Sequence, residues 1–200
     1  MKKAAFVDID GTLTDHGVAH RIGREAFDEA KGFSKLYAGT KAVQVMLGTP
    51  IKGEDWGLQT FIESLAKVGT TRDDMERYCK TCLGKNLKYN AIKHMKKIGK
   101  EYDLWLLTTG CDIGPQILER EYELGLKGYL ANKLIYCDDQ LLTCAVRYNE
   151  KNISDHVSQI ADKYDDFIVI DDRPERYDEN WKVYSSIYKY AHRGVFEDSK

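Results

Sequence analysis

Two aspartates, Asp8 and Asp10, stand two positions apart at the end of an apolar run, in the segment FVDIDGTLT of residues 6–14. Side chains two positions apart in a strand point to the same face, so both carboxylates are expected side by side where the strand ends. Two like charges that close need a cation between them or a proton on one of them. A hard divalent ion such as Mg2+ meets the first need, and a protonated carboxyl would be a general acid.

The whole segment resembles the first motif of the haloacid dehalogenase superfamily, which reads apolar-apolar-Asp-x-Asp-Gly-Thr-apolar-Thr or Val. The resemblance implies that Asp8 is a nucleophile that forms an aspartyl-phosphate, and that Asp10 is the general acid and base. It also implies a Mg2+ ion held by Asp8 and the Asp10 carbonyl, with Thr12 as a candidate phosphate ligand. Asp-Gly-Thr alone is ordinary turn chemistry, but the complete pattern favours catalysis.

A second apolar strand ends in threonines, in the segment LLTTG of residues 106–110. It resembles the second motif of the same superfamily. The Thr108 hydroxyl and the backbone N–H groups of Thr109 and Gly110 are therefore candidates to hold phosphoryl oxygens. The alternative interpretation is a capping Thr-Thr-Gly loop.

The third motif of the superfamily is a single lysine upstream of the last acidic motif. Lys151 is the candidate, because it precedes a predicted helix and stands 20 residues before Asp171. A cation there would neutralise the nucleophile and the phosphate together. Lys163 is the alternative, near the end of that helix.

The apolar run of residues 167–170 is followed by two aspartates, Asp171 and Asp172, and resembles the fourth motif in its Asp-Asp variant. The resemblance gives Asp172 the metal-ligand position, and Asp171 takes the place of the usual glycine and is a second candidate ligand. Glu175 and Asp178 remain alternatives for a further downstream acid. An acidic surface turn is disfavoured after so apolar a strand.

Strands are predicted at residues 4–9, 104–107, 167–170 and 183–184, with a hairpin over 134–136 and 141–146. Helical patterns separate them, and this alternation predicts an α/β fold with a doubly wound parallel sheet. Sites in such sheets lie beyond the carboxyl ends of the strands. The helical block of residues 15–85 interrupts the alternation and is predicted to be an inserted cap on a core of residues 1–14 and 86–200.

Within the helical block, Gly32 and Gly39 are predicted to break the pattern, and Thr71 to cap a helix whose apolar face includes Cys79 and Cys82. These two cysteines therefore read as core residues rather than a metal or redox pair. Five cysteines without a secretory signal indicate reduced thiols. Cys137 and Cys144 flank the hairpin and could be cross-strand neighbours, but free thiols are the expectation.

The overall charge and apolar content exclude several classes of protein. A formal net charge of −2 does not provide the excess of positive charge that binds nucleic acid or an anionic membrane. No stretch approaches the roughly 18 apolar residues of a membrane helix, and the N-terminal apolar run is too short for a signal peptide. A cytoplasmic monomer or homodimer is expected, whose partner is a small phosphorylated metabolite.

Two segments, residues 61–65 and 131–134, resemble phosphoserine phosphatase-like members of the superfamily, which carry a small helical cap. Three positions depart from the pattern of those members. The cap helix shows no clear arginine, and Lys67 is its nearest cation. Gly17 stands where a glutamate is expected after the first motif, and Thr109 replaces a glycine of the second motif. Phosphoserine is therefore not the expected substrate.

The prediction is a Mg2+-dependent phosphatase for a small phosphorylated metabolite. A 5'-nucleotidase is the alternative within the fold, because it shares the Asp-Asp variant, and Tyr37, Trp56 and Phe61 are available to face a base. A dehalogenase is disfavoured by Asp10 and by the acidic fourth motif. A non-catalytic binding protein is the alternative from another class. The roles of His16 and His20 stay open.

Overall fold

The computed structural model describes residues 1–15, 17–29 and 31–185, so His16 lies outside the described residues. Within them, six strands form one sheet in the order β4-β3-β2-β1-β5-β6. The strands are β1 Lys3–Asp8, β2 Asp103–Cys111, β3 Gly128–Cys137, β4 Gln140–Ala145, β5 Asp166–Ile170 and β6 Val183–Tyr184. The predicted α/β class and its mostly parallel sheet are confirmed, and all the predicted strands are present.

The register of the three central strands brings the predicted motifs to one edge of the sheet. β1 pairs in parallel with β2, where Asp8 lies opposite Leu107, and with β5, where Val7 lies opposite Ile170. The residues that follow Leu107 and Ile170 therefore start beside Asp8. Among the strands of the described residues, β4 alone runs antiparallel to its neighbour, in the predicted hairpin.

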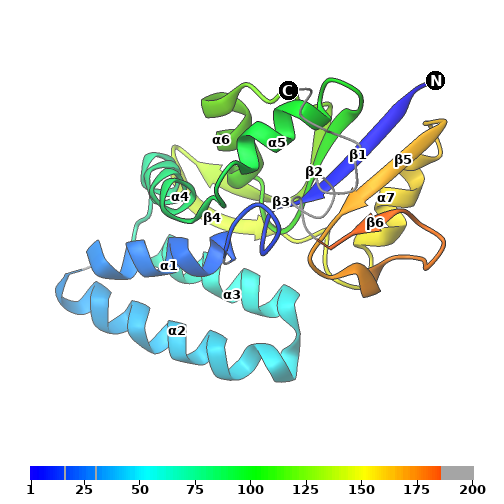
Figure 1. Cartoon of the computed structure of the whole chain (residues 1–200). Helices are drawn as coiled ribbons and strands as arrows, with labels where there is room; N and C mark the ends of the chain where they lie inside the picture. Colours follow the sequence, from blue (N-terminus) through cyan, green and yellow to red (C-terminus); the bar gives the residue numbers. More distant parts are fainter. Residues whose placement is uncertain (16, 30, 186–200) are drawn as a thin grey trace.

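The helices flank the sheet (Figure 1). They are α1 Val18–Glu29, α2 Gly32–Lys52, α3 Glu54–Lys67, α4 Arg72–Asn86, α5 Ala91–Ile98, α6 Ile113–Tyr122 and α7 Ile153–Ala161, with a 3-10 turn, η1, at Pro174–Arg176. Helices α1 to α5 lie between β1 and β2 in the chain, whereas α6 follows β2 and α7 precedes β5. In Figure 1, α2 lies farthest from the sheet and α7 lies against the β5 side. None of the described helices is both long enough and apolar enough to cross a membrane.

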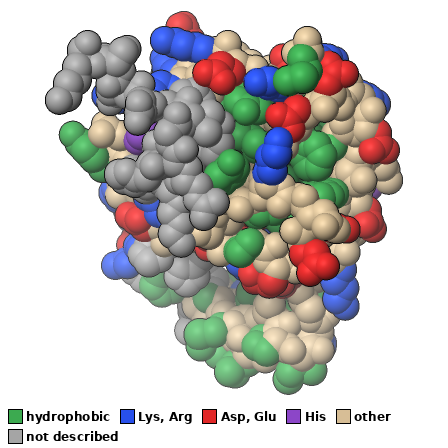
Figure 2. Space-filling view, turned by 45° about the vertical axis from the view of Figure 1, so that its right-hand side comes forward, with side chains coloured by type: hydrophobic (Ala, Val, Ile, Leu, Met, Phe, Trp, Pro, Cys, Tyr) green, Lys and Arg blue, Asp and Glu red, His purple; other side chains and the backbone are tan. Residues whose placement is uncertain are grey.

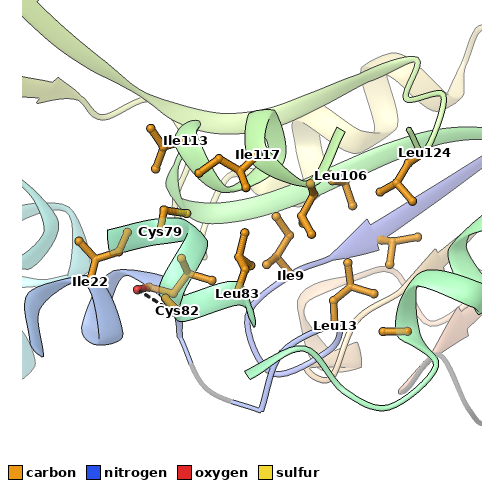
Figure 3. Close-up of a cluster of buried hydrophobic side chains, with 14 of the residues drawn as sticks. Ile9, Leu13, Ile22, Cys79, Cys82, Leu83, Leu106, Ile113, Ile117 and Leu124 are labelled. Carbon is orange, nitrogen blue, oxygen red and sulfur yellow. Dashed lines mark hydrogen bonds between the residues drawn. The ribbon is translucent and has the colours of Figure 1, made fainter. Parts of the chain in front are cut away.

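Alternate side chains of β1 enter two different hydrophobic clusters, because successive residues of a strand face opposite sides of the sheet. Ala5 and Val7 join the larger cluster with α1, α4, α5 and α6, part of which Figure 3 shows around Ile9 and Leu83. Ala4 and Phe6 join the smaller cluster, which α7 and the segment after β5 cover. The central strand is therefore buried on both faces, as a doubly wound sheet requires.

The helices between β1 and β2 follow the predicted pattern with one exception. Thr71 caps α4 in a capping box with Asp74, in which Thr71 Oγ1 accepts from the Asp74 N–H at 3.1 Å. Cys79 and Cys82 are buried in the core, as predicted. The predicted break at Gly39 is wrong, because α2 continues through it from Gly32 to Lys52.

Cys137 and Cys144 are not cross-strand neighbours in the hairpin. The strand register places Cys137 opposite Gln140 and Cys144 opposite Leu134, because two residues form the turn at Asp138–Asp139 and the register shifts between Ile135 and Tyr136. All five cysteines are free thiols.

The helical cap over residues 15–85 stays a prediction. Helices α1 to α4 occupy that interval, and apolar residues of α1, α3 and α4 join the same cluster as β1 and α6. Large apolar side chains of α2, among them Met46 and Ile51, are exposed instead. Figure 2 shows acidic and basic side chains interspersed over one face of the molecule.

Candidate active site

The ends of β1, β2 and β5 place five acidic and hydroxyl side chains of the predicted motifs together. Asp8 is the last residue of β1, and Asp171 and Asp172 follow β5 directly. Carboxylate oxygens of these three residues all lie within 4.8 Å of one another. Thr108 in β2 binds the Asp10 carboxylate, so the predicted first, second and fourth motifs meet at one point.

Asp8 is the buried centre of this group. Its side chain is 3% exposed, and its Oδ2 has no hydrogen-bond partner. Burial raises the pKa of Asp8 well above its ordinary value, and the negative charges of Asp171 and Asp10 raise it further. A buried carboxylate oxygen without a partner, beside two more carboxylates, is a donor set that fits a hard divalent cation.

Asp10 is held by two hydrogen bonds, one on each carboxylate oxygen. The backbone N–H of Val18, at the start of α1, donates to Oδ1 at 2.6 Å, and the Thr108 hydroxyl donates to Oδ2 at 2.7 Å. Burial raises the pKa of Asp10 although both hydrogen bonds oppose the shift. A raised pKa suits a group that must carry a proton in one step and accept one in the next.

The two adjacent aspartates after β5 occupy different environments. Asp171 is fully buried, and it accepts hydrogen bonds from the Tyr177 hydroxyl at 2.7 Å and from the Arg173 N–H at 2.8 Å. The Arg176 guanidinium lies 3.6 Å from the same carboxylate. Asp172 is exposed, so its carboxylate remains available to a ligand while that of Asp171 is occupied by the protein.

Gly11 allows Asp172 to approach the first motif. A Cβ atom at Gly11 would lie 2.2 Å from Asp172 Oδ2, and the Gly11 φ of +90° is itself unfavourable for other residues. Thr12, a predicted phosphate ligand, is fully buried, and its hydroxyl accepts from the Asp172 N–H at 2.9 Å. The observed contact of Thr12 thus positions the fourth motif against the first.

The other predicted phosphate ligands also make contacts within the protein. The Gly110 N–H donates to Thr108 Oγ1 at 2.8 Å, and the Thr109 carbonyl accepts from Asn132 Nδ2 at 2.7 Å. Phosphate binding by Thr108, Thr109 and Gly110 stays a prediction. The observed contacts show how this loop fixes the Thr108 hydroxyl toward Asp10.

Lys151 lies in the loop before α7, where its side chain is exposed and its backbone N–H donates to Asn149 Oδ1 at 3.0 Å. Its predicted role toward phosphate stays a prediction. Lys163 is exposed at the far end of α7. Neither Glu175 nor Asp178 belongs to the carboxylate group around Asp8 within the described part of the chain.

Two residues were assigned no role from the sequence although they contact the predicted motifs. Asn132 is fully buried, donates to the carbonyls of Thr109 and Tyr148, and accepts from the N–H groups of Arg147 and Tyr148. It therefore ties the second motif to the segment that leads to Lys151. The Lys88 ammonium donates to the Gly11 carbonyl. Asn132 could have been noticed in the sequence as a polar residue within the apolar strand β3. No sequence feature indicated a role for Lys88.

An apolar cavity adjoins Asp10 between the sheet and the helices that follow β1. Its lining, which includes Val18 and Ile22 of α1, Phe61 of α3, and Thr108 and Gly110 of β2, is here called the side cavity. Among the aromatic residues expected to face a substrate, Phe61 lines this cavity. Trp56 instead lies against Gly48 of α2, and Lys41 lies over the Tyr37 ring.

No protein-family model matches the chain, and no curated protein matches it. Solved structures do match the chain in their fold. An apo phosphoserine phosphatase shares 17% identity at a TM-score of 0.60, over 86% of this chain and 78% of that chain. This is the haloacid dehalogenase fold. A haloacid dehalogenase-family hydrolase from Salmonella enterica serovar Typhi shares 16% identity at a TM-score of 0.60, over 84% of this chain and 56% of its own.

A nucleotidase is also among the solved structures with the haloacid dehalogenase fold that resemble this chain. Cytosolic 5'-nucleotidase IIIB bound to cytidine shares 13% identity at a TM-score of 0.54, over 84% of this chain and 64% of that chain. The predicted resemblance to the haloacid dehalogenase superfamily is therefore confirmed at the level of the fold.

Proposed function

We propose that this protein is a Mg2+-dependent phosphatase that hydrolyses a small phosphorylated metabolite through an aspartyl-phosphate on Asp8. The observation that carries the proposal is the buried, unpartnered Oδ2 of Asp8 beside the carboxylates of Asp171 and Asp172. An unpaired buried carboxylate is costly to keep, so its presence at the converging strand ends indicates a chemical role. Neighbours with this fold are phosphatases and hydrolases, which supports the same class of reaction.

In the first half-reaction, an Asp8 oxygen attacks phosphorus and the bond from phosphorus to the ester oxygen breaks. Asp10 gives its proton to the departing oxygen, so the alcohol leaves neutral. In the second half-reaction, Asp10 takes a proton from a water molecule that attacks the aspartyl-phosphate. Inorganic phosphate then leaves, and Asp8 and Asp10 return to their starting states.

The chain supplies the positioning that both steps require. Thr108 and the Val18 N–H fix the Asp10 carboxylate, and Gly11 leaves room for Asp172. Asp8, Asp172 and the Asp10 carbonyl would hold Mg2+, with Asp171 beside them. When bound, the ion would neutralise charge on the phosphoryl group. Lys151 is the cation that we propose for the phosphoryl oxygens.

A 5'-nucleotidase is the second candidate, because Phe61 lines the side cavity and offers a ring on which a base can stack. A neighbour of the same fold is a cytosolic 5'-nucleotidase. A nucleoside would have to enlarge the side cavity, which favours a smaller metabolite.

The decisive experiment is a screen of sugar, amino-acid, lipid-headgroup, alkyl and nucleotide monophosphates, with Mg2+ and then with EDTA. We expect turnover that EDTA abolishes. Asp8→Asn is expected to abolish turnover while circular dichroism shows a folded protein, and Asp178→Asn, outside the carboxylate group, serves as the matched control. Near-wild-type activity in Asp8→Asn would refute the mechanism. No turnover of any ester with Mg2+ would instead favour the non-catalytic binding protein.

A further inference from the structure

Asn132 of β3 uses every hydrogen-bonding position of its fully buried side chain. Its Nδ2 donates to the carbonyls of Thr109, at 2.7 Å, and Tyr148, at 2.8 Å. Its Oδ1 accepts from the N–H groups of Arg147, at 2.7 Å, and Tyr148, at 2.8 Å. An amide offers two N–H donors and an oxygen with two lone pairs, so all its positions are filled. Because every partner is a backbone group, this side chain fixes two chain segments to each other, and it is here called the asparagine clamp.

One end of the asparagine clamp stabilises an irregular part of β2 that carries the second motif. The register shifts there, because residues 108–110 of β2 stand between two paired positions that enclose one residue of β3. Such a bulge leaves backbone groups without partners in the sheet and changes the direction of its side chains. The Thr109 carbonyl in this bulge is the group to which Asn132 donates. Asn132 therefore stabilises the backbone conformation in which the Thr108 hydroxyl binds Asp10.

The other end of the asparagine clamp holds the start of a short loop that contains Lys151. This loop, residues 147–152, is here called the lysine loop. Within it, Asn152 Nδ2 donates to the Arg147 carbonyl at 3.0 Å, and the Lys151 N–H donates to Asn149 Oδ1 at 3.0 Å. These contacts close the loop on itself, so a clamp on its first residues also fixes the backbone at Lys151.

The lysine loop also contacts the segment of the fourth motif. The Glu150 carboxylate pairs with the Arg176 guanidinium at 2.5 Å, and that guanidinium lies 3.6 Å from the Asp171 carboxylate. The loop is therefore tied to the fourth motif through Glu150 and to the second motif through Asn132. The Lys151 side chain on this loop is exposed, so it is available to an anionic ligand.

We propose that Asn132 is a positioning residue of the proposed phosphatase, which joins the bulge of residues 108–110 and the lysine loop into one unit, so that Asp10 and Lys151 act on the same phosphate ester. The inference rests on the proposed function and adds a residue that touches neither the substrate nor the reacting atoms. A proton donor and a cation that act on one ester need a fixed separation, because catalysis depends on pre-organised groups. The alternative is that Asn132 contributes only to folding stability, as a satisfied buried amide does.

The first test measures the unit itself and needs no substrate. Asn132→Leu keeps the branched shape of the side chain without its hydrogen-bonding groups. Asn86→Leu is the matched control, because Asn86 is also buried and its Nδ2 donates to the Cys82 carbonyl at 2.6 Å. In Asn132→Leu, the NMR order parameters of the Gly110 and Lys151 N–H groups are expected to fall together, from about 0.85 to below about 0.6. Unchanged values, a fall at one residue only, or the same fall in Asn86→Leu would overturn the inference.

Asn132→Asp takes the place of Asn132→Leu if the leucine variant does not fold. The carboxylate keeps an oxygen for the N–H groups of the lysine loop but loses the donor to the Thr109 carbonyl. The order parameter of Gly110 should therefore fall, and that of Lys151 should fall less. No change at Gly110 would overturn the inference in this variant as well.

The second test asks whether Asn132 acts through Lys151. Asn132→Leu and Lys151→Met are each expected to lower kcat/KM at least about tenfold, whereas Asn86→Leu should lower it much less. Residues that act as one unit have non-additive effects, so Asn132→Leu should cause a loss at least about threefold smaller in the Lys151→Met background than in the wild type. Circular dichroism checks that each variant is folded. Equal losses in the two backgrounds would indicate a general effect on the fold and overturn the inference.

The two tests separate this inference from the proposed function. If the order parameters of Gly110 and Lys151 fall together but the wild-type protein hydrolyses no ester, the asparagine clamp is supported and the phosphatase is refuted. If the wild-type protein hydrolyses an ester and Asn132→Leu is as active as Asn86→Leu, the positioning role is refuted and the phosphatase stands.

Discussion

The hydroxyl of Thr108 donates a 2.7 Å hydrogen bond to Oδ2 of Asp10, a residue 98 positions earlier in the chain. The same hydroxyl accepts a hydrogen bond from the Gly110 N–H, so its orientation is fixed from both sides. This contact joins the ends of β1 and β2 and gives Asp10 one defined position.

Thr108→Val is expected to lower kcat, because the isosteric side chain cannot donate to Asp10. A hydrogen bond to a charged group contributes about 1.5–3 kcal/mol, which corresponds to a loss of roughly tenfold to a hundredfold. Thr108→Ser keeps the hydroxyl and should retain most of the activity. Steady-state kinetics on one good substrate decide this, and equal rates for valine and serine would rule out the positioning role.

Asp172→Asn should weaken the Mg2+ dependence more than Asp171→Asn does. Asp172 is exposed at the site, whereas the Asp171 carboxylate is occupied by Tyr177 and Arg173. We expect the Mg2+ concentration for half-maximal activity to rise at least about tenfold in Asp172→Asn.

The structural role of Asp171 predicts a different defect in its variant. Asp171→Asn should mainly lower the free energy of unfolding, by about 1–3 kcal/mol, because an amide NH2 group replaces the oxygen that accepts from the Tyr177 hydroxyl and lies near the Arg176 guanidinium. Mg2+ titrations and denaturant unfolding of both variants separate the two effects. The reverse order of Mg2+ dependence would mean that Asp171 is the principal ligand.

Asp10→Asn should allow the aspartyl-phosphate on Asp8 to accumulate when the substrate is an aryl phosphate. A nitrophenolate leaves without a proton, so the first step should survive, whereas the second step loses a base that contributes about 10²–10⁴-fold. Intact mass after an acid quench should show one added phosphoryl group, with a nitrophenol burst about equal to the enzyme concentration. The adduct should vanish in Asp8→Asn/Asp10→Asn. If Asp10→Asn slows the hydrolysis of alkyl and aryl esters equally and gives no burst, the role of Asp10 is mainly structural.

The stabilisation by Mg2+ should grow with pH. Burial raises the pKa values of Asp8, Asp10 and Asp171 above the ordinary 3.8, so the metal-free folded protein binds more protons than the unfolded chain. The contribution of these three groups to stability without metal is therefore largest below about pH 4 and is lost as pH rises through their raised pKa values. Mg2+ needs these groups ionised, so it offsets the loss at high pH.

Thermal unfolding at about pH 5 and pH 8, with and without Mg2+, measures this dependence. We expect a larger rise in Tm at the higher pH. Asp8→Asn removes one of the raised groups, so it should stabilise the metal-free protein and reduce the Mg2+ effect. A Mg2+ effect of the same size at both pH values would indicate that protons and metal do not compete at this site.

Local patterns in the sequence determined the strands and the order of the candidate motifs. An apolar run followed by Asp8 or by Asp171 is a feature of a few consecutive residues, because a buried strand and its polar end depend on burial and on the alternation of side chains. The helix cap at Thr71 is equally local, since its partner Asp74 stands three residues away.

Only the tertiary structure decided which of these groups meet and what surrounds them. The different environments of Asp171 and Asp172, the contacts of Asn132 and the side cavity each depend on residues from elements far apart in the chain. The neighbours of Cys137 and Cys144 depend in the same way on strand register, which shifts between Ile135 and Tyr136. Such contacts are set by how strands and helices pack, and the spacing of residue types along one segment carries no record of that packing.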